Sequence, residues 1–155
     1  ELYDLTPAAS FTTATPRLVN VSVLKKIGAL LTVGFYIDGN TAKRVLVRAV
    51  GPTLGDAPFG VPGVVADPRL ELHSPVNGTD TIMGSNDNWG TPAGLGAANA
   101  LQLAAGFTQV GAFPLPAGSR DAAILATLQP GSYTVQVSGV NDTTGVALVE
   151  VYEVP

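Results

Sequence analysis

One short run of polar residues has the side chains that a metal ion needs. Residues 85–90 read Ser-Asn-Asp-Asn-Trp-Gly and offer one carboxylate, two side-chain amides and a hydroxyl. Calcium takes about six to eight oxygen ligands from groups of these kinds. Asn86, Asp87 and Asn88 are therefore candidate ligands of a structural Ca²⁺. The run lacks the spaced acids of an EF-hand loop, and Asn and Asp also form turns by hydrogen bonding nearby backbone. An Asx turn without a metal is the alternative.

Trp89, the only tryptophan, lies in the same run. An exposed aromatic ring on a β-sandwich can stack on a sugar ring, which would make Trp89 the contact residue of a carbohydrate-binding or adhesion module. A cell-surface glycan would then be the partner. The four tyrosines are scattered along the chain, whereas sugar platforms need several coplanar rings, and a lone tryptophan is more often packed inside. Carbohydrate binding is therefore the second functional hypothesis.

The sequence contains no recognisable catalytic constellation. Nucleophilic catalysis needs a nucleophile, a base and an orienting group, and His73 is the only histidine. It precedes Ser74-Pro75 at the end of an expected strand, no G-x-S-x-G motif occurs, and we expect His73 to be exposed there. Spacing singles out no pair of carboxylates for glycoside hydrolysis. We therefore expect a protein that is not an enzyme.

Composition excludes several classes of partner. The net charge is −4, and the eight Lys and Arg residues never gather beyond pairs such as Lys25-Lys26 and Lys43-Arg44. A nucleic-acid partner would need a basic face. The chain has no cysteine, which excludes disulfides and thiolate metal sites. No apolar run approaches the roughly 20 residues of a membrane span.

Alternation of apolar and polar residues predicts the elements that position these side chains. Charged residues make up only 13% of the chain, and 18 Gly and 12 Pro are spread along it as turn residues. We expect strands at 17–24, 29–37, 43–50, 69–73, 79–83, 121–128, 132–138 and 146–154, with one short helix at 96–107. The stretch 51–68 is expected to be a long ordered loop. This pattern predicts an all-β fold, a jelly-roll-like antiparallel β-sandwich of about eight strands.

The two ends of the chain carry near copies of one strand pattern. Residues 1–7 read Glu-Leu-Tyr-Asp-Leu-Thr-Pro, and residues 150–155 read Glu-Val-Tyr-Glu-Val-Pro. Both alternate Tyr or acid with aliphatic residues, as half-buried strands do. Residues 8–16 are small residues, Thr and Pro without periodicity. We expect an N-terminal strand and extended linker at 1–16 and one β-sandwich domain at 17–155.

The chain resembles a β-sandwich repeat of large secreted and cell-surface bacterial proteins, similar to the bacterial pre-peptidase C-terminal domain. The stretches that carry the resemblance are 17–22, 43–52, 59–63, 66–72, 85–90, 111–113, 118–122 and 133–154. The resemblance implies a spacer, adhesion or accessory role outside the cell and brings no catalytic residues. In such arrays the last strand of one repeat runs through an acid-x-Pro linker into the next, and residues 1–7 look like such an ending.

The first functional hypothesis is an extracellular or cell-surface assembly module without catalytic activity. Its terminal strands would join it to copies of itself in a head-to-tail filament, or to neighbouring repeats in a tandem array. The candidate contact residues are Leu2, Tyr3, Asp4 and Leu5 at one end and Val149, Val151 and Tyr152 at the other. Since the chain already owns a strand at 146–154, an incoming copy of residues 2–5 would extend a sheet edge rather than replace a missing strand.

Overall fold

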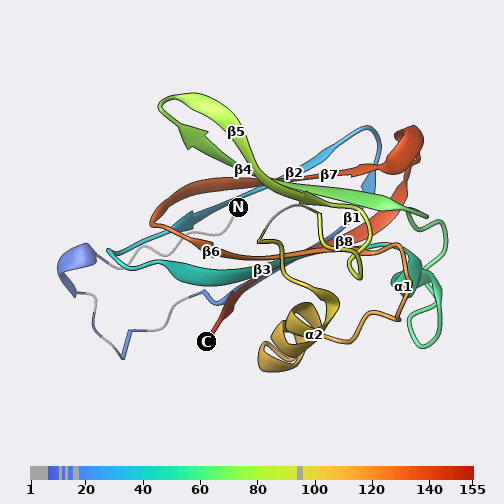
Figure 1. Cartoon of the computed structure of the whole chain (residues 1–155), viewed down its shortest axis with the longest axis horizontal. Helices are drawn as coiled ribbons and strands as arrows, with labels where there is room; N and C mark the ends of the chain where they lie inside the picture. The colour runs from blue at the N-terminus through green and yellow to red at the C-terminus, as the bar shows by residue number, and fades with distance from the viewer. Residues whose placement is uncertain (1–6, 11, 13, 16–17, 94–95) are drawn as a thin grey trace.

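Two four-stranded antiparallel sheets stack face to face (Figure 1). The computed structural model describes residues 7–155 except 11, 13, 16–17 and 94–95. The first sheet has the order β1 (Asn20–Ile27), β8 (Gly145–Val154), β3 (Lys43–Val50), β6 (Ala122–Leu128). The second has the order β2 (Leu31–Ile37), β7 (Gly131–Gly139), β4 (Pro68–Val76), β5 (Thr79–Asn86). The predicted antiparallel β-sandwich of about eight strands is confirmed.

The main core fills the space between the sheets. Alternate residues of each strand point inward, and the central strands are the most apolar. Val45, Val47 and Ala49 of β3 face this core together with Val135 and Val137 of β7, and all five are buried. The alternation in the sequence therefore decides which face of each strand is buried.

A second core covers the outer face of the first sheet. Helix α2 (Ala100–Gln109) lies against this face, away from the second sheet (Figure 1). Leu46 and Val50 of β3 point into this second core and meet Leu103 and Phe107 of the helix. Since both faces of β3 are covered, its residues 45–50 are all buried, which explains why that strand is apolar on both faces.

The helix begins later than the sequence pattern predicted. The Asn99 side chain accepts a hydrogen bond from the Gln102 backbone N–H at 3.0 Å, and the Gln102 side chain accepts one from the Asn99 N–H at 2.9 Å. This capping box begins the helix at Ala100 rather than at Gly96. A further short helix, α1 (Pro52–Gly55), lies in the stretch predicted as a loop, and short 3₁₀ turns occur at Ala8–Ser10 (η1) and Val140–Asp142 (η2).

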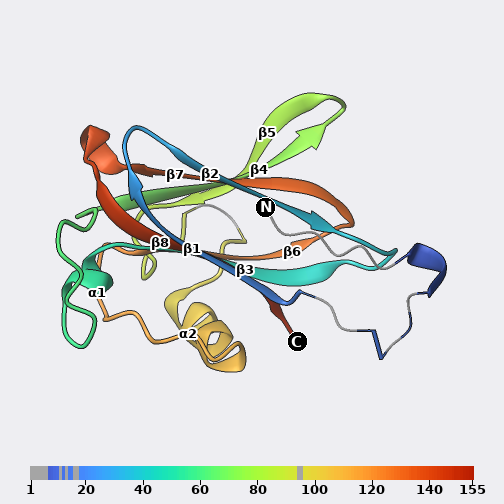
Figure 2. The same ribbon diagram turned by 180° about the vertical axis from the view of Figure 1, so that it is seen from behind.

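The connection from β4 to β5 is a hairpin turn, whereas the connection from β2 to β3 crosses between the sheets. Asn77 and Gly78 join β4 to its neighbour β5 with positive φ angles of 52° and 77°, as a two-residue hairpin turn requires. Residues 38–40 contain Gly39 and follow β2, but they do not close a hairpin, because β2 and β3 belong to different sheets. The connection from β1 to β2 also crosses between sheets. Figure 2 shows β1 and β2 at the same edge of the sandwich.

Candidate functional site

Asn86 ends β5 and ties three segments together. Its Nδ2 donates to the carbonyls of Asn88 at 3.2 Å and Thr91 at 3.1 Å, and its Oδ1 accepts from the Ala123 N–H at 3.1 Å. The side chain is buried. These bonds make Asn86 the centre of the turn at 86–91 and fix that turn to the start of β6, so its amide is already committed to backbone groups.

The side chains of Asp87 and Asn88 hydrogen bond to each other. The exposed Asp87 accepts a hydrogen bond from the Asn88 side-chain amide at 3.1 Å. Within the described residues, no group of three or more Asp, Glu or His side chains gathers to hold a metal ion. The geometry fits the Asx turn, and the calcium site at Asn86, Asp87 and Asn88 stays an untested prediction.

Trp89 is packed in the second core, with only 7% of its surface exposed. Its ring centroid lies 5.6 Å from that of Phe107, and its Nε1 donates to the Pro116 carbonyl at 3.0 Å. Stacking on a sugar needs an open ring face. The burial of Trp89 therefore counts against the carbohydrate-binding hypothesis.

Asp121 is fully buried, and its carboxylate is the centre of a hydrogen-bond network. Its carboxylate accepts hydrogen bonds from the Gly51 N–H at 2.8 Å, from the Ser119 hydroxyl at 2.7 Å and from the Thr53 hydroxyl. It thus fixes the start of α1 to the strand β6. Its neighbour Arg120 approaches Asp67 instead, with 3.6 Å between Nη1 and Oδ2.

Asp67 is a carboxylate with one buried oxygen. Burial raises the pKa of Asp67 more than the Arg120 guanidinium lowers it, and the Asp87 carboxylate raises it further. Asp67 is itself part of the segment that packs beside η2, where its backbone carbonyl accepts from the Val140 N–H at 2.8 Å. Asp67, Asp87 and Arg120 thus lie in connecting segments, and their charges interact with one another there.

A buried ion pair joins β3 to β8 under the second core. Arg48 Nε lies 3.0 Å from Glu150 Oε2, and both side chains are almost fully buried. Arg48 Nη1 also donates to the Phe113 carbonyl at 2.7 Å, and the guanidinium lies over the rings of Phe107 and Phe113 at 4.8 and 4.4 Å. Burial lowers the pKa of Arg48, and the Glu150 carboxylate opposes that shift. Arg48 thus holds the loop at Phe113 against the first sheet.

Tyr152 completes this network. Its hydroxyl donates to Glu150 Oε1 at 2.6 Å. Burial, together with this hydrogen bond, raises the pKa of Tyr152 to about 12. The half-buried tyrosine of the C-terminal strand pattern is therefore bound to its own domain.

His73 does not lie at an exposed strand end, and that prediction is wrong. It lies within β4 and is 6% exposed, because the strand continues to Val76. Its Nδ1 lies 2.9 Å from Asp80 Oδ2 and its Nε2 lies 3.4 Å from Glu71 Oε2. In the described part of the chain, neither nitrogen contacts a hydroxyl that could act as a nucleophile.

Val149 and Val151 of β8 do not lie on the surface, where direct contact with a second copy would need them. Val149 and Val151 are 1% and 8% exposed and face the main core. The strand pairs with β1 on one side and β3 on the other. β8 has no open edge, and the prediction that these valines touch a second copy is wrong. Leu2, Tyr3, Asp4 and Leu5 lie outside the described residues.

The open edges at β1 and β2 form an apolar seam that the sequence analysis did not identify. We define the β1–β2 seam by Val21 and Val23 of β1 and by Leu31, Val33 and Phe35 of β2. All five are only partly buried. Val21 and Val23 lie opposite the core residues Val151 and Val149, so they face the inside of the sandwich. In the described part of the chain, no strand pairs with the outer edge of either strand.

Comparisons with known proteins assign no family. No family model and no curated protein matches the sequence. Among solved structures, the chain is similar to a crystal structure of a protein from Sulfurospirillum deleyianum, with 9% identity, 90% of this chain and 98% of that chain covered, and a TM-score of 0.39. So weak a likeness carries no argument about function, and the resemblance to the pre-peptidase C-terminal domain stays a prediction. No helix in the described residues is long and apolar enough to cross a membrane.

Proposed function

We propose that this chain is a structural module without catalytic activity, which joins to copies of itself or to neighbouring repeats at an extracellular or cell-surface location. The observation that carries the proposal is the place of the repeated strand pattern. Its C-terminal copy lies within β8, a strand with a neighbour on each side. The N-terminal copy therefore has the sequence of a strand whose position in this domain is already filled.

An extra strand needs an unpaired sheet edge, and the seam supplies one. Edge strands present a row of N–H and C=O groups that can pair with another chain. At β1 and β2 this row borders half-buried valines and a phenylalanine, so an added strand would also cover apolar surface. Burial of such surface contributes about 25 cal/mol per Å². Both contributions favour strand addition at this edge.

The same contact can serve two assemblies. Between separate chains, a head-to-tail contact that does not close produces a filament. Between successive repeats of one longer chain, it produces a tandem array. In both, the N-terminal copy of the strand pattern carries the contact, and the linker at 8–16 sets the spacing, at most about 3.3–3.6 Å for each extended residue.

Deletion of residues 1–10 tests this proposal. We expect the full chain to form concentration-dependent oligomers by light scattering and electron microscopy, and the shortened chain to stay monomeric, because the added strand is lost. A matched control keeps residues 1–7 and replaces Ala8, Ala9 and Ser10 by Gly-Ser-Gly, and it should still assemble. The same oligomers in the full and shortened chains would refute the proposal.

A further inference from the structure

We propose that the outer edge of β1 in one copy accepts residues 1–5 of a second copy as an antiparallel strand. This inference rests on the proposed function and names the acceptor, the direction and the register of the contact.

The seam is the part of the main core that the sandwich leaves half covered. Phe35 stacks on Tyr133 with ring centroids 5.4 Å apart, and Leu31 and Val33 pack against the core beside it. On β1, Leu24 on the other face of the strand is 58% exposed. A strand added along β1 would cover the seam with one set of side chains and Leu24 with the other.

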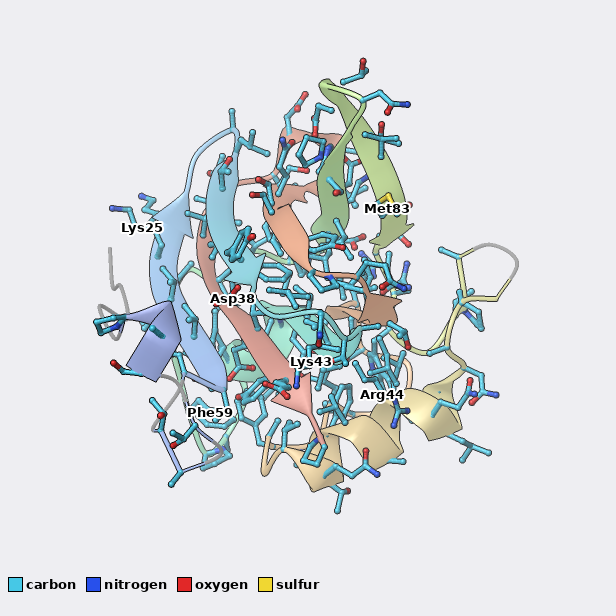
Figure 3. All side chains as sticks on the ribbon, turned by 90° about the vertical axis from the view of Figure 1, so that its left-hand side faces the viewer. Lys25, Asp38, Lys43, Arg44, Phe59 and Met83 are labelled. Carbon is cyan, nitrogen blue, oxygen red and sulfur yellow. The ribbon has the colours of Figure 1, made fainter. Side chains whose placement is uncertain are left out.

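Charge favours β1 over β2 as the acceptor. Lys25 and Lys26 stand exposed at the end of β1, and Figure 3 shows Lys25 pointing away from the sheet beside the β1–β2 connection. The incoming segment carries two acids, Glu1 and Asp4. β2 has no charged residue between Leu31 and Ile37. Opposite charges on neighbouring strands stabilise pairing, and lysines on an edge oppose pairing with non-acidic strands.

One register pairs Glu1 with a lysine, leaves Asp4 opposite Ser22 on the outer face, and places the apolar side chains over the seam. Antiparallel pairing with Tyr3 opposite Val23 places Leu5 opposite Val21, so that both incoming side chains close the seam. Leu2 then lies opposite the exposed Leu24, on the other face. Glu1 lies opposite Lys25 at the rim. A slip by one residue would turn Asp4 into the seam, and burying that carboxylate without a partner is costly.

The continuation of the docked segment also meets a suitable surface. In this register Thr6 and Pro7 of the second copy would reach Asn20 and Val19 of the first. A cavity of about 460 Å³ lies there, lined by Val19, Asn20, Gln109, Val110, Tyr152, Glu153 and Pro155. Val19 is 52% exposed, and a proline ring in this cavity would cover it.

Cysteine cross-linking tests the inference, because the chain has no cysteine of its own. A full-length Leu5→Cys chain is mixed with a Val21→Cys chain carrying a C-terminal tag and is oxidised with oxidised glutathione. We expect the mixed disulfide to exceed that with a Thr127→Cys chain by about tenfold, because bonding needs Cα atoms about 4.4–6.8 Å apart and β6 is the opposite edge of the sheet. Tyr3→Cys with Val23→Cys repeats the test should either first variant fold poorly.

The possible outcomes distinguish a failure of the assignment to β1 from a failure of the proposed function. Preferential cross-linking to Val33→Cys of β2 or to Thr127→Cys of β6 would overturn the assignment to β1. So would a closed, monomeric disulfide in the double variant Leu5→Cys/Val21→Cys at high dilution, since the segment would then pair with its own domain. If deletion of residues 1–10 abolishes assembly while Val21→Cys does not cross-link, the acceptor assignment fails and the proposed function stands. Assembly that ignores the deletion contradicts both.

Discussion

At the scale of single residues, polar side chains that looked suited to ligand binding prove to hold turns. Asn86 uses both ends of its amide on backbone groups of the following turn and of β6. Asp121 accepts from the Gly51 N–H with one carboxylate oxygen and from the Thr53 and Ser119 hydroxyls with the other. Buried polar groups must be paired, and an unpaired one costs about 1–3 kcal/mol. These residues are therefore part of the architecture that keeps the loops on the first sheet.

Substitution of Asn86 gives the sharpest test of this view. We expect Asn86→Ala to lower the free energy of unfolding by about 2–4 kcal/mol, because three backbone groups, the buried Ala123 N–H among them, lose their partner. Asp87→Ala should change it by no more than about 0.5 kcal/mol, because Asp87 is exposed. Urea unfolding followed by the fluorescence of Trp89 measures both.

The same experiment addresses calcium. We expect equal unfolding free energies in EDTA and in 1 mM Ca²⁺ for the unchanged chain. A bound ion at a hundredfold excess over its dissociation constant would add about 2.7 kcal/mol. A stabilisation of that size that Asp87→Ala removes would establish a metal site and contradict the Asx-turn interpretation.

At the scale of the elements, β3 and β8 are joined by more than backbone hydrogen bonds. Arg48 and Glu150 lie opposite each other in the register of these strands, and α2 with the segment at 110–117 covers them. Removing one member of a buried ion pair costs about 3–5 kcal/mol, whereas replacing both by apolar residues is often close to neutral. The pair therefore links the central strands to the second core.

A double-mutant cycle tests that link. Arg48→Met and Glu150→Leu should each destabilise the domain by about 3–5 kcal/mol, and the double variant should lose much less than their sum. Tyr152→Phe is the matched control, since it removes the hydroxyl that bonds to Glu150 and to Asn20 and leaves both charges in place. Chemical denaturation measures all four chains. Additive losses would mean that the two charges do not stabilise each other.

The strands also show which parts of the fold could be predicted from the sequence alone. Alternation predicted all eight strands, and β3 at the residues where it is found, because side chains of period two specify their face. It could not place Arg48 inside, since its partner Glu150 is about a hundred residues away and the covering helix is distant too. The half-open seam was also out of reach, because alternation does not say which strands end at a sheet edge.

At the scale of the whole molecule, the centre of the sandwich is complete, and among the described residues no strand pairs with the outer edges of β1 and β2. The C-terminal strand pattern is built into the middle of the first sheet. β1 and β2 lie at the same edge of the sandwich (Figure 2), and the side chains of the β1–β2 seam are only partly buried. The N-terminal copy of the pattern has the length and alternation to cover such a seam. Assembly through this edge therefore gives a role to both copies of the strand pattern.

Hydrogen exchange along β1 tests this account most directly. Mass spectrometry follows hydrogen exchange at the backbone amides of residues 20–27. The full chain and the chain without residues 1–10 are compared at concentrations at which the full chain assembles. We predict that the β1 amides that do not bond to β8 exchange at least about tenfold more slowly in the full chain, because a strand from a second copy pairs with them. Equal exchange at β1 in the two chains, or protection that appears along β6 instead, would contradict the account.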